Sequence, residues 1–205
     1  LLVASLHTAS ALMLVQVAFG AGLIFLHPAA WLTSIHMALA MLALGGLVIA
    51  STVVFLPGAE RRQSPWLVFQ SPFARLAIAS VVAVLVLMVS GALVTAVGAG
   101  ETCPGWPLCN GGLPEAGAGW LALGHRLVTL LVAFLLIALV HSAWRSQRNQ
   151  PVALTAATAA FVLFVGEALI GGLKVSRGFP VDLIGLHAAS AAGLWISYGS
   201  GRSGV

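Results

Sequence analysis

The chain has 205 residues, of which 60% are hydrophobic and only 7% are charged. A water-soluble domain of this length needs far more polar sequence to cover its surface, so the composition excludes that class of protein. The net charge of +4 comes from short connections between apolar segments, which gives no reason to expect nucleic acid as a partner.

Six apolar segments follow one another along the chain, and each is long enough to cross the hydrocarbon core of a membrane as a helix. We therefore expect an all-α integral membrane protein with six transmembrane helices. The predicted spans are 5–26, 31–56, 76–98, 119–144, 152–174 and 181–199. They are predicted to form a transmembrane hairpin (1–56), a cytoplasmic connection (57–74), a four-helix bundle (75–199) and a tail (200–205).

Basic residues are distributed unevenly over the connections. Six of the nine fall in the second and fourth connections and in the tail, and the positive-inside rule places those segments in the cytoplasm. Both termini are then cytoplasmic, and the loop at 99–118 lies outside a bacterial plasma membrane. The chain opens with Leu1 rather than Met, which leaves open whether it is processed or truncated at that end. The six basic residues are Arg61, Arg62, Arg75, Arg145, Arg148 and Arg202.

An internal repeat relates the N-terminal hairpin to the last two predicted helices. Residues 12–40 align without a gap on residues 163–191, and the match includes a histidine and a polar partner. A duplicated helical hairpin that keeps a histidine inside lipid suggests a metal or haem site built twice. The matched pairs are Gly20 with Gly171, Gln16 with Glu167, and His36 with His187.

Two cysteines, Cys103 and Cys109, lie in the predicted outer loop and are separated by proline and glycine residues. Turn-forming residues bring the thiols close together, and the outer face is oxidising, so we expect a disulfide that stiffens a lid over the helix ends. The alternatives are two free thiols or a metal site with partners elsewhere. Two cysteines without a nearby histidine are poor zinc ligands, which argues against the metal site.

Three histidines lie at a similar depth, because His36, His125 and His187 each fall five or six residues inside a span that starts at the outer face. At about 1.5 Å per residue this depth is roughly 8–10 Å. Each could be a hydrogen-bonded structural histidine, but the common depth favours axial ligation of a haem iron by His125 and His187. The other three, His7, His27 and His141, are assigned to the membrane interface.

Three further residues are candidates for the same site. Arg126 follows His125 and either reaches haem propionates or simply anchors its helix at the membrane boundary. Glu167 is expensive to bury in a membrane, so it has either a proton-carrying or haem-facing role or a hydrogen bond to a neighbouring helix. Gln16, its counterpart in the repeat, is expected to hold helices together. Glycines near these positions would admit a flat ring, although ordinary helix packing accounts for them equally well.

Several strings resemble the haem A synthase family over nearly the whole chain. SGALVTAVGAGETCPGWPLCNG followed by LGHRL is similar to that family's first-helix exit, outer cysteine loop and histidine-bearing second helix. LVQVAFGAGL…IHMALA and LFVGEALIGGL…LHAASA are similar to its third and fourth helices, in two copies. The family has eight transmembrane helices in two four-helix halves, each of which offers two histidines to a haem. Its enzymes oxidise a methyl group of haem O to the formyl group of haem A and use a bound haem b.

The resemblance implies roles for the candidate residues. His125 and His187 would hold haem b, with Arg126 beside it. His36 would face a second haem, the haem O substrate, and Glu167 is a catalytic candidate together with His36. Membrane lipid, haem, haem O synthase and cytochrome oxidase or another membrane complex are the implied partners.

Two departures from the family pattern keep a second function open. The first two helices of the family are absent from these residues, and the glutamate that the family carries three residues before a catalytic histidine is here Ala122. The alternative to the enzyme is therefore a non-catalytic b-type cytochrome, or a haem-binding subunit of a respiratory or photosynthetic membrane complex.

Overall fold

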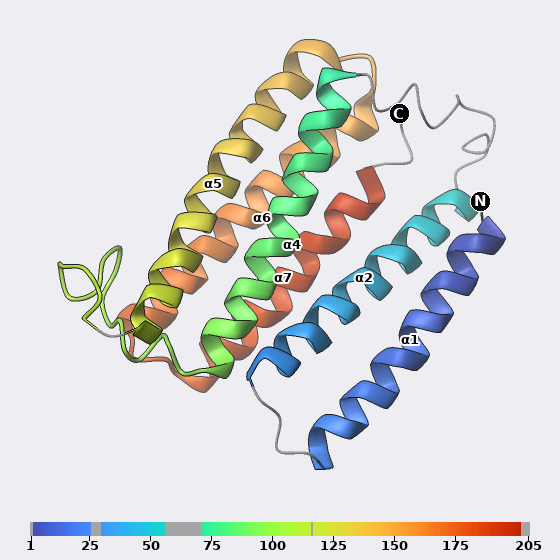
Figure 1. Ribbon diagram of the computed structural model, residues 1–205. Helices are drawn as coiled ribbons and strands as arrows, with labels where there is room; N and C mark the ends of the chain where they lie inside the picture. The colour runs from blue at the N-terminus through green and yellow to red at the C-terminus, as the bar shows by residue number, and fades with distance from the viewer. Residues whose placement is uncertain (1, 26–29, 56–70, 116, 202–205) are drawn as a thin grey trace.

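A computed structural model of the chain describes residues 2–25, 30–55, 71–115 and 117–201. Within these ranges it contains six helices, as the sequence predicts, and Figure 1 shows them side by side with their long axes roughly aligned. The helices are α1 (Leu2–Phe25), α2 (Ala30–Phe55), α4 (Pro72–Ala96), α5 (Gly117–Ser146), α6 (Pro151–Ser176) and α7 (Val181–Gly201).

The helices have the length and surface of membrane-spanning segments. In the described residues, α2, α4, α5 and α6 are long and apolar enough to cross a membrane, while the apolar stretches of α1 and α7 are shorter. Large apolar side chains point outward, as lipid requires and water does not favour; Leu14 is 74% exposed and Phe134 is 70% exposed. The chain is thus an integral membrane protein made of helices.

Consecutive helices pair as α1 with α2, α4 with α5, and α6 with α7. The last four helices form a closed bundle, because α5 also packs on α6 and α7 also touches α4. In this bundle α5 and α7 therefore occupy opposite corners. Helix α2 packs against both α4 and α7, and α1 lies beside α2 at the edge of the assembly (Figure 1). The division into a hairpin and a four-helix bundle stays a prediction.

The bundle interior is filled by aliphatic side chains from several helices. Val84, Val132 and Leu136 are completely buried, and Leu194 is nearly so. The hydroxyl of Ser80, also fully buried, donates to the carbonyl of Leu76 at 2.9 Å, so its own helix satisfies it.

A side-chain hydrogen bond joins α2 of the N-terminal hairpin to α7 of the bundle. Trp195 of α7 donates from Nε1 to the carbonyl oxygen of Met41 on α2, at 2.7 Å. The indole ring can approach because Gly45 faces it; a Cβ at that position would lie 3.2 Å from Nε1. Trp195 is 7% exposed, so this hydrogen bond lies within the packed interior.

The predicted connection 57–74 ends earlier than expected, because the next helix already begins at Pro72. Helix α4 begins at Pro72, whose fixed φ suits the first helical position. Residues 56–70, which include Glu60, Arg61 and Arg62, lie outside the described residues, as do His27, Arg202 and the rest of the tail after Gly201.

Candidate functional site

His125 of α5 is held in one orientation by α4. Its Nδ1 lies 2.9 Å from Oγ of Ser90. The Ser90 hydroxyl has a single proton, which it donates to the carbonyl oxygen of Leu87 at 2.8 Å. The contact with Ser90 occupies Nδ1, so Nε2, the ring nitrogen on the other side, is the atom left to bind a metal.

His187 of α7 is held in a similar way by α6. Its Nδ1 lies 2.9 Å from Oε1 of Glu167, in a contact that is short but bent. The other oxygen of Glu167 accepts a hydrogen bond from Ser190 of α7. Because a carboxylate only accepts, the Nδ1 atom of His187 carries the proton, and Nε2 is again the atom with a free lone pair.

His36 of α2 repeats this arrangement in the N-terminal hairpin. Its partner is Gln16 of α1, whose Nε2 lies 3.1 Å from Nε2 of His36. The ring of Phe19 also stacks on the imidazole, with centroids 6.1 Å apart. In the described part of the chain, Nδ1 of His36 and Oε1 of Gln16 are buried without a hydrogen-bond partner, and so is Nδ1 of His187, which meets Glu167 only through the bent contact described above.

A glycine of the preceding helix lies under each of the three imidazoles. A Cβ built at Gly91 would lie 2.9 Å from Cε1 of His125, and one at Gly171 would lie 3.0 Å from Cε1 of His187. Gly20 faces His36 in the same way, at 2.8 Å. Any larger residue would displace the rings. The sequence repeat thus has a geometric counterpart, because the polar residue, the glycine and the histidine have the same spacing in both hairpins, although Gln16 meets Nε2 of its histidine and Glu167 meets Nδ1.

The predicted disulfide between Cys103 and Cys109 is present, with Cα atoms 4.5 Å apart. Cys103 is completely buried and Cys109 is 9% exposed, and both pack with Ala99 and with Ala122 of α5. In the catalytic half of the resembling family, the position three residues before the second-helix histidine is a glutamate; the position three residues before His125 is Ala122. Here its small side chain lies in the cluster that contains the disulfide.

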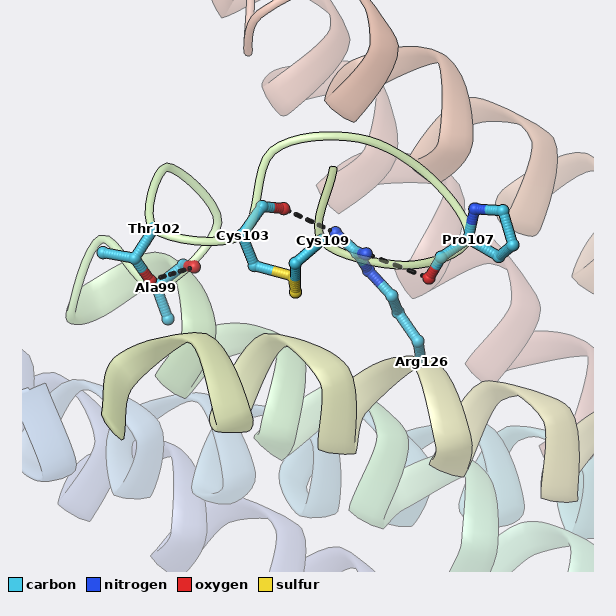
Figure 2. The surroundings of a disulfide bond; sticks show 6 residues. All are labelled: Ala99, Thr102, Cys103, Pro107, Cys109 and Arg126. Atoms are coloured by element: carbon cyan, nitrogen blue, oxygen red, sulfur yellow. Dashed lines mark hydrogen bonds between the residues drawn. A yellow bond between two sulfur atoms is a disulfide. The ribbon is translucent and has the colours of Figure 1, made fainter. Parts of the chain in front are cut away.

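Arg126 ties the disulfide loop to α5. Figure 2 shows its guanidinium extending from the helix into the loop, where it meets two carbonyl groups. Nη1 donates to Pro107 at 3.0 Å, and Nη2 donates to Cys103 at 2.9 Å. The structure therefore gives Arg126 a positioning role that neither sequence-based alternative anticipated; its predicted contact with haem propionates stays a prediction.

The loop also reaches α6 and the turn before α7. Trp106 approaches Gly172 of α6, where a Cβ would lie 3.8 Å from the indole ring. Phe179, in the turn between α6 and α7, packs on Gly100 at the start of the loop. Because Arg126 adjoins His125 and Gly172 adjoins the glycine under His187, both histidines lie near the segment that this loop covers.

These residues fit a haem better than a bare metal ion. Among the described residues no group of three or more His, Cys, Asp and Glu side chains could hold a metal on its own. A haem iron needs only two protein ligands, because the porphyrin supplies four nitrogens. Two imidazoles from opposite corners of a bundle, each with Nδ1 engaged and a glycine beneath it, match that requirement.

Sequence reasoning found part of this arrangement. It did not find Ser90, whose contact with His125 depends on how α4 and α5 pack together. For Glu167, the structure shows the hydrogen-bonded alternative, with His187 and Ser190 as partners. His7 and His141 are exposed on the helices, as expected of interface residues. The catalytic roles predicted for His36 and Glu167 stay predictions.

The relatives of this chain described below are all named haem A synthase. No protein-family model matches the chain. The chain is 33% identical over 115 residues to the haem A synthase of Alkalihalophilus pseudofirmus, a match covering 54% of the chain and 39% of that relative. It is 31% and 30% identical over 116 residues to the haem A synthases of Bacillus mycoides and Bacillus cereus, covering 55% of the chain and 37% of each relative. The chain thus matches well under half the length of these proteins, and over that part it is related to the haem A synthases.

Proposed function

We propose that this chain acts as a haem A synthase-like membrane oxidoreductase, which oxidises a methyl group of haem O to a formyl group and carries a bis-histidine haem b in the bundle α4–α7. The observation that carries the proposal is the orientation of His125 and His187. Each imidazole has its Nδ1 atom 2.9 Å from a polar atom of the preceding helix, which leaves Nε2 as the nitrogen that would bind an iron. The similarity to haem A synthases supports the choice of reaction.

The chain's own residues would hold and orient the cofactor. His125 and His187 are the proposed axial ligands, Ser90 and Glu167 hold their Nδ1 atoms, and the disulfide loop held by Arg126 covers the outer end of the site and limits access of water. When bound, haem b would supply one-electron transfer during oxidation of the substrate.

The N-terminal hairpin is the proposed place of the substrate. His36 meets Gln16 through Nε2, and its Nδ1 atom is buried without a hydrogen-bond partner among the described residues. An imidazole can bind a metal through such a nitrogen when that nitrogen carries no proton. We propose that His36 faces haem O, and that haem O synthase and cytochrome oxidase are partners in a bacterial plasma membrane, with the cysteine loop outside.

The second candidate is a non-catalytic b-type cytochrome or a haem-binding subunit of a larger membrane complex. This candidate stays open because the catalytic glutamate of the resembling family is not accounted for: the position three residues before His125 is Ala122, which is 3% exposed and packs with the disulfide. Both candidates need the same haem at His125 and His187. They differ in whether haem A is formed.

The test is expression in the membrane of a bacterial host that makes haem O, followed by purification of the full chain. We expect a low-spin b-type spectrum in the reduced-minus-oxidised difference, lost in His125→Ala and in His187→Ala but kept in His141→Ala, whose side chain is exposed. Full haem content in either ligand variant would reject the proposed site. Extraction and mass measurement of the haems then separates the candidates, because the enzyme produces haem A and the cytochrome does not.

A further inference from the structure

We propose that Glu167 is a positioning residue that makes His187 the more strongly donating of the two axial ligands and thereby lowers the reduction potential of the bound haem. This inference rests on the proposed function, since it requires His187 to be an iron ligand. It assigns to Glu167 an action through the imidazole rather than on the substrate.

The position of Glu167 fits this action. It lies on α6 and is 7% exposed, in a chain that crosses a membrane, where a carboxylate without partners is costly. Its two oxygens are shared between His187 and Ser190, which lie three residues apart on α7. Both partners hold the carboxylate against the ring, so its charge is directed at the Nδ1–H group.

The three histidines differ in the charge of their partners. Ser90 offers a neutral hydroxyl to His125, and Gln16 offers a neutral amide to His36. Glu167 offers a carboxylate to His187. Gln16 and Glu167 occupy equivalent places in the repeat, with a glycine four residues later and a histidine twenty residues later. Gln16 meets Nε2 of its histidine, whereas Glu167 meets Nδ1, the nitrogen opposite the one that would bind the iron.

A carboxylate that accepts the Nδ1 proton increases electron density on Nε2 and the basicity of the ligand. A more basic imidazole stabilises the more positive, oxidised iron, so the potential falls. The effect is strengthened inside the bundle, because the low local dielectric screens the carboxylate less than water would. A purely structural glutamate would hold α6 and α7 together without changing the potential.

The experiment compares the purified, haem-loaded full chain with Glu167→Gln, Ser190→Ala and Glu115→Gln. Potentials are measured by redox titration followed through the absorption spectrum, and haem loss is measured as transfer to excess apomyoglobin. Glu115 is an exposed loop residue and serves as the matched control. We expect Glu167→Gln to shift the potential to more positive values and to lose haem about 10- to 100-fold faster. Ser190→Ala should shift it in the same direction by less, and Glu115→Gln should match the parent chain.

Each result separates the inference from the proposed function. If His187→Ala retains the parent's haem, the proposed ligand pair is wrong and the inference falls with it. If haem depends on His187 but Glu167→Gln leaves the potential unchanged, the inference alone is overturned. Should Glu167→Gln fail to accumulate, Ser190→Ala decides, and an unchanged potential in that variant also overturns the inference.

Discussion

Replacement of the glycines beneath the histidines by alanine should separate helix stability from haem binding. At Gly91 the added Cβ would lie 2.9 Å from Cε1 of His125. Non-bonded carbon atoms rest at about 3.5–4.0 Å, so the ring must withdraw by roughly 0.6 Å or more. The Ser90 hydrogen bond, now 2.9 Å, would then lengthen toward about 3.5 Å, beyond the range of an effective hydrogen bond.

The expected energies have opposite signs. Loss of the Ser90–His125 hydrogen bond costs about 0.5–1.5 kcal/mol. Replacing a helical glycine by alanine gains about 1 kcal/mol in helix propensity. The stability of the haem-free chain should therefore change little. Haem affinity should fall about 10- to 100-fold, because axial ligand distances tolerate only about 0.2 Å of error.

The chain provides matched controls for this prediction. Gly124, next to His125, and Gly166, next to Glu167, have no atom within 4 Å of an added Cβ. Gly91→Ala and Gly171→Ala should lose haem to apomyoglobin faster than the parent chain, whereas Gly124→Ala and Gly166→Ala should not. Thermal unfolding in detergent checks that the four variants remain folded. Equal haem retention in all four would refute the argument that the glycines set the position of the imidazoles.

Three further substitutions test the contacts around the site. Trp195→Phe removes the indole donor to the Met41 carbonyl, which keeps its hydrogen bond within α2, so the free energy of unfolding should fall by about 0.5–1.5 kcal/mol, measured by thermal or chemical unfolding in detergent; an unchanged value would mean that water replaces the indole. Arg126→Lys cannot satisfy both loop carbonyls, so dithiothreitol should reduce the disulfide faster than in the parent chain, and equal rates would contradict the positioning role. Ala122→Glu places a carboxylate in the buried disulfide cluster, so the free energy of unfolding should fall by roughly 2 kcal/mol or more in the same unfolding assay. A stable variant that forms more haem A would instead show that the position can host a catalytic acid.

The helices and the repeat could be predicted because their signals are local. Long apolar runs predict membrane-crossing helices without knowledge of their neighbours. The repeat paired His36 with Gln16 and His187 with Glu167 because an alignment preserves spacing along one hairpin, and a hairpin brings its two helices together. The disulfide was predictable for the same reason, since six residues separate Cys103 from Cys109.

Contacts between distant helices could not be predicted, because they depend on helix rotation. Ser90 is one of several hydroxyl residues that bond to their own helix; Ser80 and Thr158 do the same without any contact to a histidine. Nothing in the sequence distinguishes Ser90 from them until α4 and α5 are placed together. Trp195 and Met41 are separated by 154 residues, and their contact follows from the packing of α2 against α7.

The two hairpins share their geometry but differ in charge, and this difference bears on how the protein divides its work. The register of glycine and histidine is the same in both copies, because any side chain in place of Gly20 or Gly171 would strike the imidazole. The polar partner is less constrained, since an amide and a carboxylate occupy almost the same volume. A duplicated hairpin can therefore keep the position of its ligand while changing the electronic character of that ligand through one atom of the partner. On the proposed function, the neutral partner Gln16 suits a site that must bind and release a substrate haem, and the anionic partner Glu167 suits a site that retains its cofactor.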